Sequence, residues 1–234
     1  MTKFNIKTIK TKKAITDFAV IGLCVTIVII GAFIFNSRRY AYITAVVTLL
    51  TLFLGFLSFE KTQSGSRYLV LVATITALSI AGRLAFYPIA YFKPVCAMVI
   101  ICGMFIDRRA AFICGSLSAL ISGFFFGLGA WVPFQMLAWG LIGFISGLLA
   151  SPLKKSKVFL IAYAIISALF YSAFLDVFTV LQYDEVINIK LYITTLINAL
   201  PVIIIYIISN IVFLLVLSDF IGKKINHMRI KFGF

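Results

Sequence analysis

The chain alternates between long apolar stretches and short polar connections. A helix needs about 20 apolar residues, at ~1.5 Å each, to cross the ~30 Å hydrocarbon core of a bilayer. The pattern therefore predicts an all-α integral membrane protein with about eight transmembrane helices. The predicted spans are residues 14–35, 40–59, 68–87, 94–106, 110–128, 133–150, 157–181 and 191–218. The fourth is short and should begin inside the connection YPIAYFKP, where Pro88 and Pro94 favour an extended or broken backbone.

Composition supports the same class. Of the 234 residues, 63% are hydrophobic and only 12% are charged, so a water-soluble fold could not bury the apolar surface. The N-terminal apolar run is too long for a signal peptide and lacks an A-x-A cleavage site, which favours a retained span. All four cysteines lie in apolar stretches without a CxxC pair, so we expect buried thiols rather than a disulfide or a metal site.

The positive charges predict an orientation. With the N-terminus inside, 16 of the 21 Lys and Arg residues fall on the cytoplasmic side and four fall outside, while Arg83 lies within a span. This asymmetry follows the positive-inside rule and explains the net charge of +14 without a nucleic-acid partner. Eight spans then place both termini in the cytoplasm and the stretch GAWVPFQ on the outer side.

The stretch GLGAWVPFQMLAWGLIG concentrates both tryptophans of the chain around a proline and a glutamine. Pro133 suits the first turn of a helix, after which Trp131, Gln135 and Trp139 recur every four residues and could share a face. An interfacial aromatic belt explains one tryptophan, but an amide exposed to lipid needs a partner. The alternatives are a belt and the wall of an outward-facing binding pocket.

A few other polar groups in or near the outer half of the membrane are candidate ligand contacts. Arg83 should face a cavity or snorkel to the headgroups, and Asp176 could pair with Arg83 or contact a ligand. Of two asparagines on the last span, ~18 Å apart along a helix, only Asn198 is expected near the outer cavity, and Asn210 is not. Tyr91 belongs to the 83–94 connection. Aromatic rings with a few hydrogen-bonding tips suit a flat, ring-bearing organic solute better than a bare ion.

From about Ala73 to Ala150 the sequence resembles the substrate-binding S components of energy-coupling factor (ECF) vitamin transporters. The resembling stretches are AGRLAFYPIAYFKPV and GMFIDRRAAFICGSLSALISGFFFGLGAWVPFQMLAWGLIGFISG. The resemblance implies a six-helix core over residues 68–222, an additional two-helix hairpin within residues 1–67, and a basic cytoplasmic tail at 223–234. Three residues at the presumed ligand rim depart from the family pattern, so the ligand cannot be carried over from it: Gly123, Ala130 and Phe134.

The family implies a function and partners. An S component binds a vitamin or vitamin precursor from outside a prokaryotic plasma membrane and works with a separate membrane scaffold and two ATP-binding cassette subunits. Overall likeness mildly favours a cobalamin-like ring compound. Ala73, Ala77 and Ala81 form a stripe of small residues that could dock on the scaffold or pack within the molecule. A second small stripe, Gly140, Gly143 and Gly147, is expected to pack within the core.

Catalysis is not expected. The sequence contains no GxxxxGK[ST] motif, and its one histidine, His227, lies in the basic tail, so neither an ATPase site nor a metal or cofactor site is predicted. Two other functions stay open. The first is a non-transporting scaffold for cell shape or envelope assembly, and the second is a proton-driven carrier, which a single intramembrane Asp supports weakly.

Overall fold

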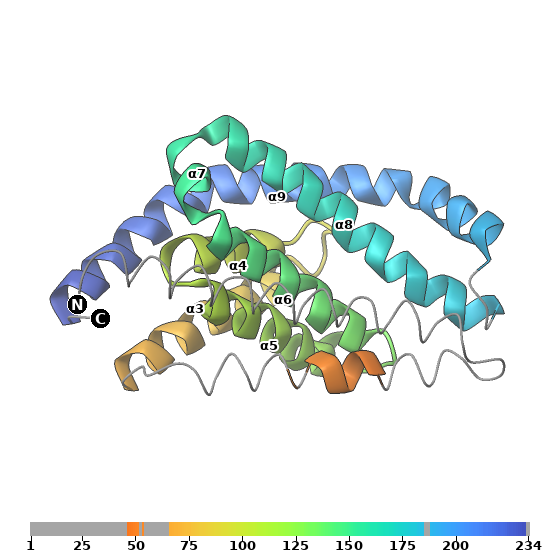
Figure 1. The fold of residues 1–234 in the computed structure, drawn as a ribbon, viewed down its shortest axis with the longest axis horizontal. Helices are drawn as coiled ribbons and strands as arrows, with labels where there is room; N and C mark the ends of the chain where they lie inside the picture. Colours follow the sequence, from red (N-terminus) through yellow and green to blue (C-terminus); the bar gives the residue numbers. More distant parts are fainter. Residues whose placement is uncertain (1–45, 52, 54–65, 185–187, 233–234) are drawn as a thin grey trace, which may run out of the picture.

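The computed structural model describes residues 46–51, 53, 66–184 and 188–232, and within these residues it is helical without strands (Figure 1). Residues 46–51 and 53 are helical. The later helices are α3 (Ser66–Ala85), α4 (Val95–Phe105), α5 (Arg108–Phe126), α6 (Val132–Leu148), α7 (Ala150–Lys155), α8 (Lys157–Asp184) and α9 (Ile189–Phe232). The all-α class predicted from the apolar pattern is confirmed.

Four of these helices, α3, α5, α8 and α9, are long and apolar enough to cross a membrane, and α4 and α6 are shorter apolar helices. The structure therefore supports a membrane protein but does not show eight spans. The predicted span 14–35 lies outside the described residues, as does most of 40–59. The segment expected as one span at 133–150 ends at Leu148 and is followed by the short helix α7. The basic tail from 223 continues α9 as helix to Phe232.

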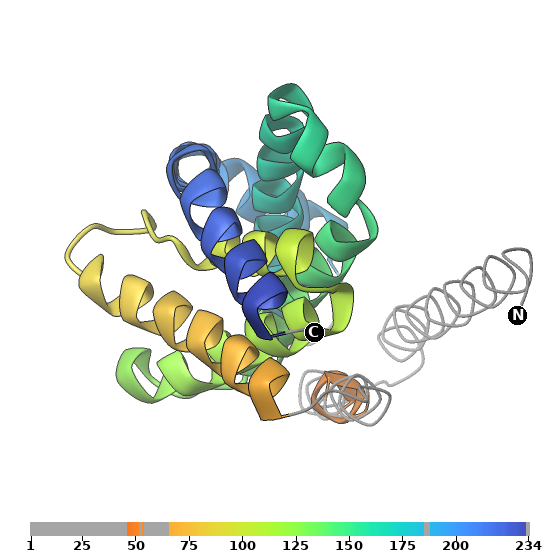
Figure 2. The same cartoon turned by 90° about the vertical axis from the view of Figure 1, so that its left-hand side faces the viewer.

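Helix α4 lies in the middle of the bundle, as the end-on view in Figure 2 shows. It contacts α3, α5, α6, α7 and α9, and every residue from Val95 to Met104 is buried. A helix that is hydrophobic all round is expected in such a position. With 11 residues, α4 is only about 16 Å long and cannot cross a bilayer alone. The helix begins at Val95, directly after the connection at residues 86–94 and not inside it as predicted.

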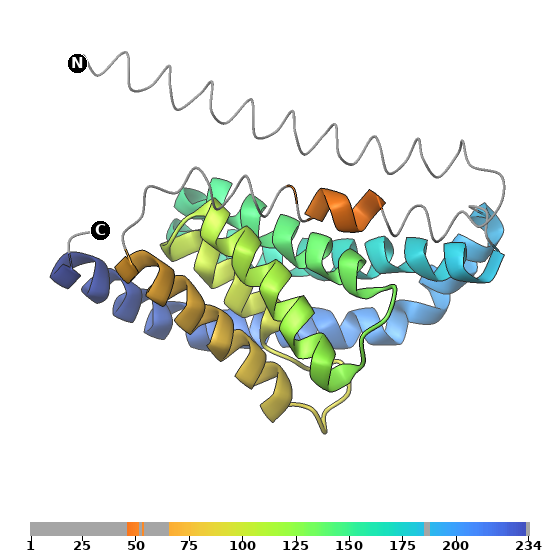
Figure 3. The same ribbon diagram turned by 90° about the horizontal axis from the view of Figure 1, so that it is seen from below.

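Helices α5 and α6 lie side by side (Figure 3) because glycines allow their backbones to approach. A Cβ atom added at Gly143 would lie 2.6 Å from the carbonyl oxygen of Ala111, and one added at Gly147 would overlap the Cα of Arg108. The prediction that this small stripe packs within the core is confirmed. At the same end of α5 as Arg108, Asp107 caps the helix by accepting from the backbone N–H of Arg109 and Ala110 at 2.7 and 3.0 Å.

The alanine stripe of α3 faces outward. Ala73, Ala77 and Ala81 are exposed, while the opposite face of the helix, including Leu71 and Ile75, is buried. Packing within the described part of the chain therefore does not explain these alanines. Large apolar side chains are also exposed on α8 and α9, as expected of helices in contact with lipid.

Candidate functional site

The connection between α3 and α4 is anchored on α9. The backbone N–H of Lys93 donates to Ser209 Oγ at 2.9 Å, and the Ser209 hydroxyl donates back to the Lys93 carbonyl at 3.0 Å. Phe86 and Phe92 pack against the ring of Phe213, with centroids 5.0 and 5.1 Å away. Non-helical backbone is tolerated in a membrane protein where it lines a cavity, and four residues of this connection, Tyr87, Ala90, Tyr91 and Lys93, line one.

Two local features shape the connection. Pro94 packs on α3 at Gly82, where an added Cβ would lie 2.6 Å from its ring carbon Cγ. Tyr91 has a φ of 60°, in the left-handed region that a bulky residue rarely adopts. The Tyr91 ring meets that of Tyr206, and backbone strain of this kind clusters at functional sites.

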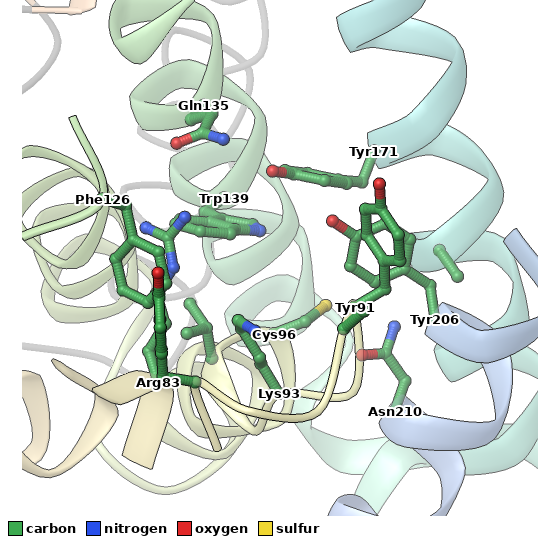
Figure 4. Close-up of a pocket in the computed structure, with 14 residues that line it drawn as sticks. Arg83, Tyr91, Lys93, Cys96, Phe126, Gln135, Trp139, Tyr171, Tyr206 and Asn210 are labelled. Carbon is green, nitrogen blue, oxygen red and sulfur yellow. The ribbon is translucent and has the colours of Figure 1, made fainter. Parts of the chain in front are cut away.

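A cavity of about 430 Å³ lies between this connection and the helices (Figure 4). Its volume falls within the usual range for small-molecule sites, ~300–1,000 Å³. Side chains from α3, the connection, α4, α5, α6, α8 and α9 converge on it. They are Arg83, Tyr87, Ala90, Tyr91, Lys93, Val95, Cys96, Phe126, Gln135, Trp139, Ala168, Tyr171, Tyr206 and Asn210.

Arg83 is the central charged group of the cavity. Its guanidinium lies between the rings of Phe126 and Trp139, 4.4 and 4.9 Å from their centroids, and is only 9% exposed (Figure 4). Nη1 donates to the hydroxyl of Ser122. Arg83 is therefore held in place by aromatic faces and one hydroxyl, and it faces the cavity instead of snorkelling to the surface.

Lys93 brings a second positive charge to the same side. Its Nζ donates to the carbonyl oxygens of Ile89 and Phe86, at 3.2 and 3.4 Å, and lies 5.6 Å from the ring centroid of Phe126. Burial, and then repulsion by the Arg83 charge, lower the pKa of the Lys93 ammonium below its ordinary value of 10.5. As the pH rises, Lys93 therefore loses its charge earlier than an ordinary lysine does.

The repulsion between these two cations can be measured. We expect Arg83→Gln to raise the pKa of Lys93, because one repelling charge is removed, yet to leave it below 10.5 because burial remains. The pH dependence of acetylation of Lys93 by acetic anhydride, followed by mass spectrometry of its peptide, gives this pKa. Lys190→Gln, which removes an exposed cation outside the cavity, should leave it unchanged. If the pH dependence of Lys93 acetylation is unchanged in Arg83→Gln, the two cations do not repel each other as the structure indicates.

Aromatic rings form a continuous wall along the cavity. Trp139 stacks on Tyr171 with an interplanar angle of 6° and centroids 5.3 Å apart, Tyr171 meets Tyr206 edge-on at 5.3 Å, and Tyr206 meets Tyr91 at 5.9 Å. Gln135 lines the cavity one turn before Trp139. Flat rings with polar tips at their edges suit a ring-bearing solute.

Asn210 adds a buried amide on α9. It is 2% exposed, and its Nδ2 donates to the carbonyl of Ala164 at 3.3 Å. Its Oδ1 is buried and has no partner among the described residues. A buried acceptor left unpaired costs about 1–3 kcal/mol, so a bound group that donates to it would recover this cost.

The structure brings together four of the seven residues proposed from sequence: Arg83, Tyr91, Gln135 and Trp139. The other three do not line the cavity. Trp131 lies over Gly129 at the start of α6 and is 39% exposed. Asp176 has a buried Oδ2 without a hydrogen-bond partner and forms no ion pair with Arg83, so that suggested pair is absent. Asn198 is exposed, and Asn210, which was expected to lie away from the outer cavity, lines it instead.

Sequence reasoning missed several lining residues, of which Tyr171 and Tyr206 are the most informative. Each lies well inside an apolar helix. Tyrosine in a membrane protein is enriched at the interfaces, so a tyrosine in the middle of a span signals a polar neighbour or a cavity. That signal was available for both residues. Lys93 was counted among the outer charges and lay in the 83–94 connection without being singled out, and Phe126 lay in the apolar run at 110–128.

The lining of the cavity is typical of a small-molecule site. Two cations, several polar tips and an aromatic wall line one cavity, and no group of three or more His, Cys, Asp or Glu residues that could hold a metal ion occurs in the described ranges. The absence of a cofactor and of catalysis stays a prediction. Comparisons of the chain with protein-family models, with curated proteins and with solved structures found no match. What the cavity binds is therefore argued from its own residues.

Proposed function

We propose that the chain is the solute-binding S component of an energy-coupling factor importer in a prokaryotic plasma membrane. It takes up a vitamin or vitamin precursor from outside and works with a membrane scaffold and two ATP-binding cassette subunits. The observation that carries this proposal is the cavity of about 430 Å³, in which a buried arginine and an aromatic wall meet inside an apolar helical bundle. A purely structural bundle has no use for that combination, because burying an ionisable group costs stability.

The distribution of charge supports an outward-facing cavity. Basic residues stand where α3, α5 and α8 begin and where α7 ends: Arg67, Arg108, Arg109, Lys154, Lys155 and Lys157. The cavity is lined by the opposite ends of α3 and α5, at Arg83 and Phe126. By the positive-inside rule, the basic ends are cytoplasmic and the cavity opens to the outside.

The size of the cavity constrains the solute. Its volume lies in the lower half of the usual range for small-molecule sites, which favours a compact ring compound. A cobalamin-like compound would place only one of its arms in the cavity, with the remainder outside. The substrate class is therefore better described by the groups that enter the cavity than by the size of the whole solute.

The alanine stripe of α3 is the proposed docking face for the scaffold. Ala73, Ala77 and Ala81 are exposed and follow one another at four-residue spacing, so they present little side-chain bulk to a partner helix. In a bilayer, close approach of helix backbones drives association, because the hydrophobic effect does not distinguish lipid from protein.

Co-purification tests the proposed function. The tagged chain in mild detergent is expected to bring down the host's scaffold and both ATPase subunits, whereas Ala73→Leu, Ala77→Leu and Ala81→Leu together should reduce their recovery at least tenfold. Ala162→Leu, on an exposed position of α8, is the control and should leave recovery unchanged. If the native chain retrieves none of these subunits, the transporter proposal fails, and a non-transporting scaffold or an independent carrier takes its place.

A further inference from the structure

The charge balance of the cavity indicates what its ligand must supply. Arg83 is buried, and its one hydrogen bond, to Ser122, uses one of the five N–H groups of a guanidinium. None of the acidic residues within the described ranges forms an ion pair with it. Aromatic faces stabilise the cation but leave its charge uncompensated. A buried charge of this kind is normally paired, so a partner is missing.

A second cation makes the imbalance larger. The Lys93 ammonium lines the same cavity and lies over the same Phe126 ring as Arg83, so two positive charges face one space with no carboxylate from the described residues lining it. Like charges held together destabilise the empty site. An anion placed between them would remove both the repulsion and the unpaired charge.

The far side of the cavity adds an independent sign of a ligand. Asn210 comes from α9, across the view of Figure 4 from Arg83 on α3, and its buried Oδ1 has no partner among the described residues. The wall formed by Trp139, Tyr171 and Tyr206 runs along the cavity, and its rings offer flat surfaces. The cavity thus presents a cationic side, an aromatic wall and a lone acceptor.

We propose that this cavity recognises a ring-bearing solute through an oxyanion, a carboxylate or a phosphate, which Arg83 and Lys93 hold together. The ring of the solute lies along the aromatic wall, and an N–H or O–H of the solute donates to Asn210 Oδ1. This inference rests on the proposed function and narrows it from any vitamin-like compound to one that carries a negative charge. It identifies Arg83 as the residue that selects the charge of the solute.

Three probes with the same ring system test the inference: 2-naphthoate, 2-naphthyl phosphate and the neutral 2-naphthamide. Binding to the full chain is measured by titration calorimetry in dodecyl maltoside, which carries no phosphate that could compete. We expect at least one anion to bind about 10- to 100-fold more tightly than the amide, the range given by ~1.5–3 kcal/mol for charged hydrogen bonds. The tighter anion shows whether the natural group is a carboxylate or a phosphate.

Variants tie this preference to the cavity. Arg83→Gln should remove the preference for the anion, Lys93→Gln should weaken it, and Lys190→Gln, an exposed lysine outside the cavity, should have no effect. Arg83→Lys keeps the charge and should retain a weaker preference, which serves as the test if Arg83→Gln does not fold. The inference is overturned if 2-naphthamide binds as tightly as both anions, if no probe binds, or if Arg83→Gln keeps the preference of the native chain. Recovery of the scaffold and ATPase subunits does not depend on the probes, so this failure is distinct from failure of the proposed function.

Discussion

Gly143→Val is expected to lower the thermal stability of the protein more than any other single substitution considered for this bundle. A side chain at this position would meet the carbonyl oxygen of Ala111 and a methyl group of Val99, both 2.6 Å from an added Cβ. Because the first of these is backbone, relief requires α5 and α6 to separate. Overpacking of a core costs about 1–3 kcal/mol, and more where backbone must move.

A second glycine on the same face adds to this effect. An added Cβ at Gly147 would overlap the backbone of Arg108, so the double variant Gly143→Val and Gly147→Val should fail to give a folded protein. Unfolding is followed with a thiol-reactive fluorogenic dye, because Cys96, Cys102 and Cys114 are buried in the native fold. Exposure of these thiols reports the loss of helix packing. A measurement of helical content alone would not report it.

Gly222→Val serves as the matched control. The group nearest to an added Cβ at Gly222 is the ring of Phe105, a side chain that can turn aside. We expect a smaller fall in melting temperature than at Gly143. Equal falls at the two positions would show that the close approach of α5 and α6 does not limit stability.

Ser209→Val is expected to release the 86–94 connection from α9 and to abolish solute binding. The Ser209 hydroxyl both accepts from and donates to the backbone of Lys93, and valine puts a methyl group in its place and adds a second methyl group, neither of which can form a hydrogen bond. Each buried backbone group left without a partner costs about 1–3 kcal/mol. Tyr91 and Lys93 line the cavity from this connection, so its release displaces two residues that line the site.

Two measurements check this expectation. Hydrogen exchange of residues 86–94 should accelerate in Ser209→Val, and titration of the tighter naphthalene anion should show at least a tenfold loss of affinity. The control is Ser218→Ala, because Ser218 is also buried on α9 but its hydroxyl has no hydrogen-bond partner in the described part of the chain. It should bind as the native protein does. Unchanged exchange in Ser209→Val would mean that the two hydrogen bonds do not hold the connection.

Most helices could be predicted from the sequence because features of short segments determine where they form. The apolar run expected at 110–128 is α5 at 108–126, and the run expected at 68–87 is α3 at 66–85. Pro88 and Pro94 correctly indicated where the backbone would leave helical geometry, since proline removes a donor and restricts the residue before it. The small stripe from Gly140 to Gly147 was identified as a packing face because small residues three or four positions apart share one helix face and let a neighbouring helix approach closely.

The site depended on contacts that no local pattern contains. Ser209 binds the backbone of Lys93 across 116 residues of sequence, and this bond places the connection at the level of the middle of α9. The neighbouring Asn210 therefore lines the cavity, while Asn198, ~18 Å away along the helix axis, does not. Spacing along a helix predicts which residues share a face, but not the depth at which another segment meets that face.

What the sequence by itself determined was the all-helical class, the apolar character of the helices, the break near Pro88 and Pro94, and the expectation that Arg83 would either face a cavity or snorkel to the headgroups. Each of these follows from hydrophobic pattern, proline geometry or the cost of burying a charge, which are properties of short segments. The tertiary structure alone decided that α4 lies in the middle of the bundle, that Tyr171 and Tyr206 build the aromatic wall, and that Trp131 lies outside the cavity. These outcomes depend on how seven segments, distant in sequence, approach one another, and packing across such distances is not encoded in any one of them.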